Sequence, residues 1–436
     1  MNVDMQSLWV RLFLAGTIFN FLLYQTLELI AWRHRCTVGA FVPPELVGYV
    51  EPATLKQSIA YKNARYRLFV VRSFCFVAVS LFLMLSGFYV RLFFALWNGT
   101  HNAYASVLLF SLISSIPLEV ISIPFDIYRE FKIEKTFGFS NMTLRLWLLD
   151  SLKGLLVSVF VGLPLVCGAV TLFVHTNRWW LLLGSVYVAF SFLVSFVYPM
   201  LIAPLFNKFT PLEDGELKTA LESLLTKTGF KAKSLLVMDA SKRSGHSNAY
   251  FTGFGKGKRI VLYDTLIKQL SVSEIKAVLA HELGHYKKHH IAKKLCIMVP
   301  LIFGLLAVLN MLVRIPDLYI SFGYPLEPSS VVGGAVQFLG LFLLIQVFSG
   351  FLPFVSFVSN MASRHDEFEA DHFSAELCGS GQELSHALIV LNNKNLSPVS
   401  VPTVYSLLLY SHPPLLERLR ALSATKPHAN SKQTPI

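Results

Sequence analysis

The chain has 436 residues, and its composition excludes an ordinary soluble protein. Hydrophobic residues make up 54% of the chain and charged residues only 15%, with a mean hydropathy of +0.54. A soluble globular chain is about one quarter charged, so this chain lacks the polar side chains to cover a water-facing surface. The net charge of +12 raises the question of nucleic acid. Basic residues gather in loops beside apolar segments and not in runs with interleaved aromatics, so we expect membrane lipid and no nucleic acid as partner.

Seven apolar segments are long enough to cross a bilayer, which needs about 20 largely apolar residues per helix. They cover residues 8–31, 68–90, 103–123, 155–174, 179–202, 295–313 and 331–358. Most have Trp, Tyr, Arg or Lys near an end, as interfacial anchoring predicts. The seventh segment is long enough to be tilted, or broken at Pro353. The sequence therefore predicts a polytopic, mainly α-helical membrane protein.

The charges of the connecting loops predict an orientation. The loops after the first and third segments are basic, with Arg33, Arg35, Lys56, Lys62, Arg65, Arg67, Arg129, Lys132, Lys135, Arg145 and Lys153. The alternate loops, 91–102 and 175–178, have one Arg each. The positive-inside rule then places the N-terminus in the lumen and the stretch after the fifth segment in the cytosol.

The five cysteines exclude two kinds of site. They form no CxxC pair, and three of them lie inside predicted spans, so we expect neither a disulfide framework nor a thiolate zinc site.

Residues 204–290 read as a cytosolic domain inserted between the fifth and sixth spans. Helical periodicity covers 216–228, and strands are predicted at 234–239, 248–252 and 259–263. The last two strands flank a turn with Gly253, Gly255 and Gly257, which predicts a hairpin. An exposed edge strand, with 259–263 as the candidate, could pair with an extended peptide substrate.

A metal-binding motif lies on the next helix. Ser271 and Glu274 form a capping-box pattern, and the apolar residues after them recur at helical spacing. His281 and His285 therefore project from one helix face one turn apart and can reach one Zn²⁺ ion. Glu282 lies beside them, where it can take a proton from a metal-bound water. Gly284 is unusual inside a helix, so we expect another segment to approach the backbone there.

Catalytic zinc needs a third protein ligand, which the topology places after residue 358 or before 281. Residues 363–373 are acidic and helical, with Glu367 and Asp371 one turn apart. Glu367 would then be the third ligand, and Asp371 would hydrogen-bond a ligand histidine and orient its ring. His365, Glu369 and His372 compete with Glu367 for this role. The alternative is a solvated charged helix.

Two further polar segments allow two interpretations. Lys287, Lys288, His289 and His290 are interpreted as a solvated, membrane-proximal face. His412 precedes two prolines, so it either caps a helix or donates a hydrogen bond to the oxyanion formed in amide hydrolysis.

The segments divide the chain into five parts. They are spans one to five with their cytosolic loops (1–203), the metalloprotease domain (204–290), spans six and seven (291–358), a cytosolic helical region with the third ligand (359–425), and a disordered tail (426–436).

Five blocks in this order resemble the type I CAAX prenyl protease family, which are integral-membrane zinc endopeptidases. The blocks are Phe-Lys-Ile-Glu-Lys-Thr-Phe-Gly-Phe-Ser at 131–140, His-Ser-Asn-Ala-Tyr-Phe-Thr-Gly-Phe at 246–254, Val-Leu-Ala-His-Glu-Leu-Gly-His at 278–285, Glu-Phe-Glu-Ala-Asp at 367–371 and Ser-His-Pro-Pro at 411–414. The resemblance runs nearly end to end and includes the seven-span layout.

The resemblance implies one zinc ion per chain bound by His281, His285 and Glu367, with Glu282 as general base. It further implies that Asn248 and His412 bind and orient the peptide, and that Asp371 and Arg418 support the site. It implies a water-filled chamber walled by the seven helices. Members remove the three C-terminal residues of prenylated CAAX proteins, and some make a second, upstream cut. They reside in the endoplasmic reticulum and often in the inner nuclear membrane.

One residue departs from the family pattern, and two other functions compete with the prenyl protease. Glu369 stands where a neutral Gln is expected, and its charge could lower the affinity for acidic peptides. A heat-shock-type quality-control protease would share the zinc helix without a prenyl preference. A transporter or zinc-bound scaffold would lack hydrolysis, and few ionisable residues lie in the spans, which argues against transport.

Overall fold

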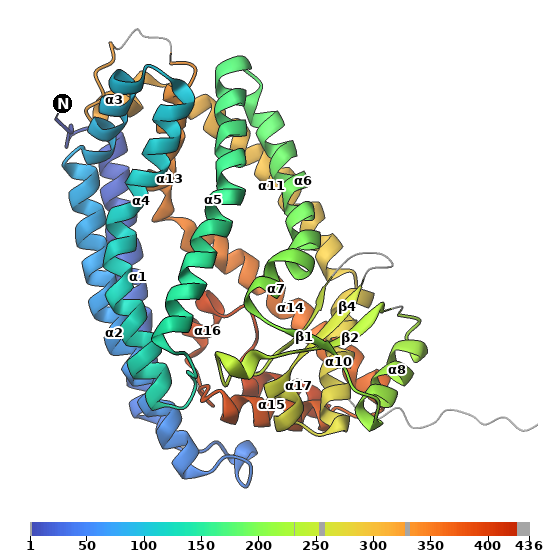
Figure 1. Cartoon of the computed structure of the whole chain (residues 1–436). Coiled ribbons are helices and arrows are strands. Elements are labelled where there is room, and N and C mark those ends of the chain that lie inside the picture. Colours follow the sequence, from blue (N-terminus) through green and yellow to red (C-terminus); the bar gives the residue numbers. More distant parts are fainter. Residues whose placement is uncertain (1, 231, 253–257, 328–331, 425–436) are drawn as a thin grey trace, which may run out of the picture.

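Among the described residues, six helices are long and apolar enough to cross a membrane, and a bent helix pair makes a seventh span; they run between the two ends of the molecule (Figure 1). The computed structural model describes residues 2–230, 232–252, 258–327 and 332–424, so the predicted glycine turn at 253–257 and the tail 426–436 lie outside the described residues. The straight spans are α1 (Leu8–Cys36), α2 (Pro52–Leu85), α4 (Ala103–Tyr128) with η3 (Arg129–Glu134), α5 (Leu144–His175), α6 (Trp179–Val197) with η4 (Tyr198–Ile202) and α7 (Ala203–Phe206), and α11 (His290–Leu312).

The seventh span is broken, as Pro353 predicts. Helices α13 (Val336–Ser349) and α14 (Leu352–Cys378) meet at an angle of 68°. Pro353 stands in the first turn of α14, where its missing N–H leaves no helical hydrogen bond unmade. With the bent pair counted as one span, the described residues agree with the predicted seven.

The second span differs from its predicted limits. Helix α2 begins at Pro52 and ends at Leu85, because no helix breaker separates the polar residues after Pro52 from the apolar run. Gly87 follows with a φ of +70°, a left-handed conformation that glycine adopts without strain. Residues 88–90 therefore belong to a separate helix, α3 (Phe88–Thr100), and not to the second span.

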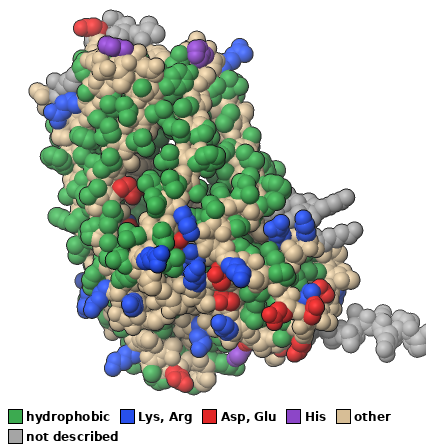
Figure 2. Space-filling view, in the orientation of Figure 1, with side chains coloured by type: hydrophobic (Ala, Val, Ile, Leu, Met, Phe, Trp, Pro, Cys, Tyr) green, Lys and Arg blue, Asp and Glu red, His purple; other side chains and the backbone are tan. Residues whose placement is uncertain are grey.

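The spans close into a ring. In chain order, α1, α2, α4, α5, α6, α11 and α13 each contact the next, and α13 contacts α1. Within their apolar windows only 6% of α5 and of α6, and 0% of α11, is buried. Most side chains of these three helices are uncovered, whereas α13 has six buried residues, and the chamber itself stays a prediction. On the face shown in Figure 2, apolar side chains cover the part of the molecule that the ring of spans forms, and the Lys and Arg side chains concentrate toward the opposite end.

An apolar core closes the ring at the end that carries α3 and α12 (Pro316–Ser321). Its largest fully buried side chains include Phe93, Phe110, Trp179 and Tyr319. Phe173 of α5 and Phe338 of α13 meet edge to face there, with ring centroids 6.3 Å apart. We call this the α3 end, and the opposite one the sheet end.

A small mixed sheet marks the sheet end. The strand order is β1 (Phe209–Pro211), β2 (Ser234–Met238), β4 (Arg259–Tyr263), β3 (Ala249–Thr252). Strands β3 and β4 are antiparallel, which confirms the hairpin, whereas β2 and β4 are parallel. Strand β4 is therefore internal, and its prediction as an edge strand is wrong. Its consecutive buried residues, Ile260, Val261 and Leu262, indicate a strand covered on both faces.

The helices of the sheet end are α8 (Glu216–Lys227), α9 (Asp264–Gln269), α10 (Val272–Lys287), α15 (Gln382–Lys394), α16 (Thr403–Leu409) and α17 (Leu415–Ala424). Short 3₁₀ turns lie at η1 (Val38–Ala40), η2 (Pro44–Leu46) and η5 (Ala240–Lys242). Helix α10 packs against both α14 and α15, and Ala387 is buried in the same core as Leu279. The segments predicted as separate parts, 204–290 and 359–425, thus build one unit over the residues described.

Candidate metal centre

Helix α10 presents the two histidines as predicted. The backbone N–H of Ser271 donates to Glu274 Oε2 at 2.6 Å and the backbone N–H of Glu274 donates to Ser271 Oγ at 3.4 Å, so the capping box is confirmed. Two turns further on, the Nε2 atoms of His281 and His285 lie 3.3 Å apart.

Helix α14 supplies the third candidate ligand. Glu367 Oε1 lies 3.3 Å from His285 Nε2, and Oε2 lies 3.5 Å from His281 Nε2. One ligand atom from each of the three residues lies within 4.8 Å of the others. The competitors point elsewhere: His365 and His372 are exposed, and Glu369 pairs with His290.

The residues present fit a metal ion. Glu367 is only 2% exposed, and among the described residues its Oε2 accepts no hydrogen bond. A buried carboxylate oxygen without a donor is costly, and a cation between Glu367 and the two imidazoles would satisfy it. Two imidazoles and one carboxylate, all from helices, are also the ligand types of catalytic zinc sites that keep one position open.

Asp371 and Arg418 support His281 from behind. Asp371 Oδ1 lies 2.8 Å from His281 Nδ1, so the other ring nitrogen, Nε2, faces the ligand position. Arg418 of α17 donates to both oxygens of Asp371, at 2.8 and 2.6 Å. Burial alone would lower the pKa of His281, but the two carboxylates beside it outweigh burial and raise that pKa. The carboxylates thus hold the ring firmly in this orientation.

Glu282 and His412 complete the polar surroundings. Burial raises the pKa of Glu282 above that of an ordinary glutamate, against the influence of the neighbouring histidines. His412 Nδ1 lies 2.9 Å from Glu367 Oε1, while most of the His412 side chain stays exposed. Its ring therefore contacts the metal ligand on α14, which favours a role in the site over capping of α17.

Among the described residues, no hydrogen bond or ion pair joins Asn248 to this cluster, although β3 contacts α10. Asn248 is exposed and immediately precedes edge strand β3, and its backbone carbonyl accepts a hydrogen bond from Tyr263 N at 3.0 Å. Its side-chain Oδ1 accepts from the adjacent Ala249 N at 2.9 Å. Seven other site residues were predicted, and six of them are joined by direct contacts. The seventh, Glu282, lies beside them on α10, and Asn248 stands at the start of the edge strand.

The interpretation of His290 as part of a solvated face is wrong. His290 is buried, its Nδ1 lies 2.8 Å from His285 Nδ1, and its Nε2 lies 3.0 Å from Glu369 Oε2. His289 has a φ of +56°, and this break between α10 and α11 returns the next ring to the metal site. Glu369 also lies 3.9 Å from Lys288 and 3.5 Å from Lys293, so cations accompany its charge, and its effect on acidic peptides stays a prediction.

The loop block at 131–140 also packs against the block that contains Asn248. The rings of Phe139 and His246 stack with centroids 4.2 Å apart, and Glu134 Oε2 lies 3.7 Å from His246 Nε2. The Glu134 carboxylate raises the pKa of His246. No local sequence pattern predicts this contact, because it joins residues about a hundred positions apart.

A ring of membrane-length helices with a buried His-His-Glu cluster and an adjacent glutamate defines a membrane metalloendopeptidase. Two family models match the chain: peptidase family M48 over residues 211–426, and the CAAX prenyl protease N-terminal region, five membrane helices, over residues 31–208. The chain belongs to the CAAX prenyl proteases of peptidase family M48.

Relatives and a solved structure agree with this assignment. The chain is 34% identical to CAAX prenyl protease 1 homolog of Oryza sativa subsp. japonica over 89% of this chain and 92% of that one. It is 34% identical to CAAX prenyl protease 1 of Saccharomyces cerevisiae, over 87% and 88% of the two chains. The crystal structure of S. mikatae Ste24p matches with a TM-score of 0.88 and 31% identity, over 96% of this chain and 99% of that chain.

Proposed function

We propose that this protein is a zinc-dependent endopeptidase that removes the three C-terminal residues from prenylated CAAX proteins. The observation that carries the proposal is the convergence of His281, His285 and Glu367 at the sheet end of the ring, with Glu282 next to them. The names of the relatives, CAAX prenyl proteases, support the substrate class.

The residues have distinct parts in the proposed reaction. His281, His285 and Glu367 would hold the ion, and Asp371 with Arg418 fixes the orientation of His281. A bound zinc ion supplies Lewis acidity, which polarises the scissile carbonyl and makes water more acidic. Glu282 takes the proton from the attacking water and passes it to the leaving amine, a task helped by its raised pKa. His412 donates to the carbonyl oxygen as negative charge develops there, and Asn248 binds the peptide backbone beside β3.

The proposed location follows from the basic loops. They support a cytosolic sheet end and a lumenal N-terminus. Residence in the endoplasmic reticulum, with the inner nuclear membrane as a second site, is proposed from the resemblance to the family. Substrates would approach from the cytosol with their prenyl group in the bilayer or in the ring interior.

The test is cleavage of a farnesylated CAAX peptide by the purified protein, beside its unprenylated twin. We expect cleavage that a chelator abolishes and that Glu282→Gln lowers by about 10²–10⁴ with the metal retained. Equal cleavage of both peptides would support a quality-control protease of the heat-shock type. A metal-loaded protein that cleaves neither peptide would overturn the proposal and leave the scaffold or transporter function.

A further inference from the structure

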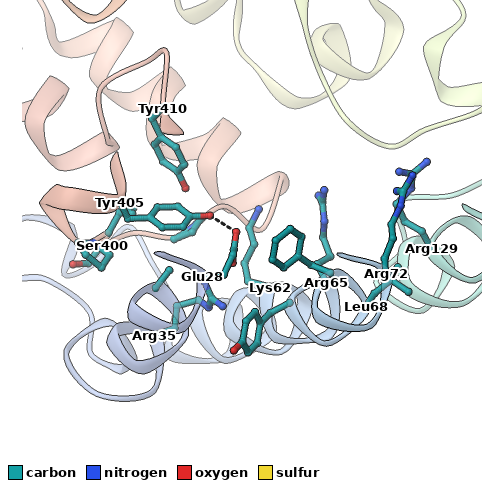
Figure 3. A pocket seen from close by; sticks show the side chains of 16 residues that line it. Glu28, Arg35, Lys62, Arg65, Leu68, Arg72, Arg129, Ser400, Tyr405 and Tyr410 are labelled. Atoms are coloured by element: carbon teal, nitrogen blue, oxygen red, sulfur yellow. Dashed lines mark hydrogen bonds between the residues drawn. The ribbon is translucent and has the colours of Figure 1, made fainter. Parts of the chain in front are cut away.

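A strongly basic cavity lies at the sheet end of the ring, separate from the metal cluster. It has a volume of about 370 Å³ and lies between α1, α2 and the segment 398–410 (Figure 3). The cationic side chains that line it are Arg35, Lys62, Arg65, Arg72 and Arg129. In Figure 3 the last four extend side by side toward the same side of their helices.

The carboxylates nearby do not balance this charge. Glu28 lines the cavity and accepts a hydrogen bond from Tyr405 Oη at 2.6 Å. Asp126 is not among the lining residues, but it lies 3.5 Å from Arg72 and 3.3 Å from Arg129. Glu134 is engaged by Tyr61 at 2.9 Å and by His246. Five cations thus face three carboxylates, which leaves an excess of two positive charges.

One of the cations is buried with an unused donor. Arg35 is only 7% exposed, and its Nε donates to Asn63 Oδ1 at 3.2 Å. Among the described residues, its Nη2 has no hydrogen-bond partner. A buried charge without a partner is costly, and a guanidinium pairs best with a carboxylate or a phosphate. The cavity therefore has the charge of an anion-binding site, and Arg35, which lines it, has a donor that no described residue uses.

The cavity is a short distance from the metal centre. Tyr410 lines the cavity, and His412, two residues further on, lies 2.9 Å from Glu367. Asn360 of α14 donates to Leu408 O at 2.9 Å, which fixes α16 against the helix that carries Glu367. The step of two residues from Tyr410 to His412 spans at most about 7 Å. The three residues of the substrate beyond the scissile bond span about 10 Å when extended. An anion three residues beyond the scissile bond can therefore reach the cavity.

We propose that this cavity binds the C-terminal carboxylate of the substrate and so sets the length of the removed peptide at three residues. The inference rests on the proposed function, because it takes the CAAX peptide as the ligand. Leu68, Phe69 and Val401 line the cavity beside the cations, and such apolar surface suits the side chain of the last residue next to its carboxylate. Arg65 is the exposed cation of the set, and its Nη1 donates to Tyr61 Oη at 3.1 Å, so it is the cation chosen for substitution.

The test compares a farnesylated CAAX peptide with its C-terminal amide, using the metal-loaded full chain in nanodiscs. For the wild type we expect KM for the amide at least about tenfold above that for the acid, with kcat similar. In Arg65→Gln the KM for the acid should rise toward that for the amide, and an unchanged ratio of the two KM values would overturn the inference. Arg67→Gln is the matched control, since Arg67 is exposed on the same helix and does not line the cavity.

Other outcomes overturn the inference. Equal KM for acid and amide in the wild type, with both cleaved, would refute carboxylate binding while the proposed function stands. A phosphate-bearing lipid in the cavity would instead make activity depend on anionic lipid in the nanodisc, and Arg65→Gln would change both peptides alike. Loss of cleavage of both peptides by the wild type with metal bound refutes the proposed function itself.

Discussion

Gly284 of α10 and Ala370 of α14 are in direct backbone contact. A β-carbon on Gly284 would lie 2.9 Å from Ala370 Cα and 3.2 Å from Ala370 O. Because both neighbouring atoms belong to the backbone, neither can turn aside. This contact explains the glycine inside the zinc-binding motif, and it brings Glu367 within reach of His281 and His285.

Gly284→Ala should therefore separate the two helices. We expect a destabilisation of about 1–3 kcal/mol from overpacking and a weaker hold on the metal. Thermal unfolding in detergent and metal titration of the purified variant measure both effects. Gly304→Ala in α11 is the control, since no atom lies within 4 Å of its added carbon, and it should be neutral or slightly stabilising. An unchanged metal affinity in Gly284→Ala would show that the helices tolerate separation.

Asp371→Asn tests the support behind His281. The amide can present its NH₂ group to the ring in place of an acceptor oxygen and weakens the pair with Arg418. We expect metal affinity to fall about 10–100-fold, measured by competition with a chromogenic chelator. Glu376→Gln, on the exposed part of the same helix beside His372, should leave the affinity unchanged. Equal metal affinities of Asp371→Asn and Glu376→Gln would mean that Asp371 does not support the metal site.

His290 should act through His285 and not as a ligand of a second ion. His290, Asp366 and Glu369 lie close enough to hold an ion, but Lys293 and Lys294 lie 3.5 and 3.3 Å from the two carboxylates and already balance their charge. We expect elemental analysis to find one metal per chain. His290→Leu should weaken its binding about 10–100-fold by leaving His285 Nδ1 without its partner. Two metals in the wild type, one of them lost in Glu369→Gln, would reverse this assignment.

The parts of the site that were predictable depend on local sequence. The spacing of His281 and His285 and the capping box at Ser271 specify the helix and its face without any tertiary information. The prediction of Glu367 followed from topology, because the sixth and seventh spans return the chain to the side of the membrane that carries His281 and His285. The seven spans and the break near Pro353 followed from apolar length and from proline's missing donor.

The remaining features depend on contacts that no local pattern specifies. His290 reaches His285 through the left-handed conformation of His289, which a non-glycine residue adopts only when tertiary packing holds it there. Strand β1 has three residues and ends in Pro211, so only its pairing with β2 makes it a strand. Arg35 lines the basic cavity together with the segment 398–410, which lies more than 350 residues further along the chain.

The pair formed by His246 and Glu134 predicts a pH-dependent stability. The pKa of His246 is raised in the folded protein, chiefly by the Glu134 carboxylate. The charged ring therefore stabilises the fold fully below its unfolded value of 6.5, and this contribution disappears as the pH rises through the raised folded value. The difference in Tm between wild type and His246→Gln should be largest at about pH 6 and smaller at about pH 9. Glu134→Gln should abolish this pH dependence, whereas His175→Gln, at the exposed end of α5, should not alter it. A difference in Tm that stays constant across this range would mean that His246 contributes only through its stacking on Phe139 and its hydrogen bond with Asn395, and not through its charge.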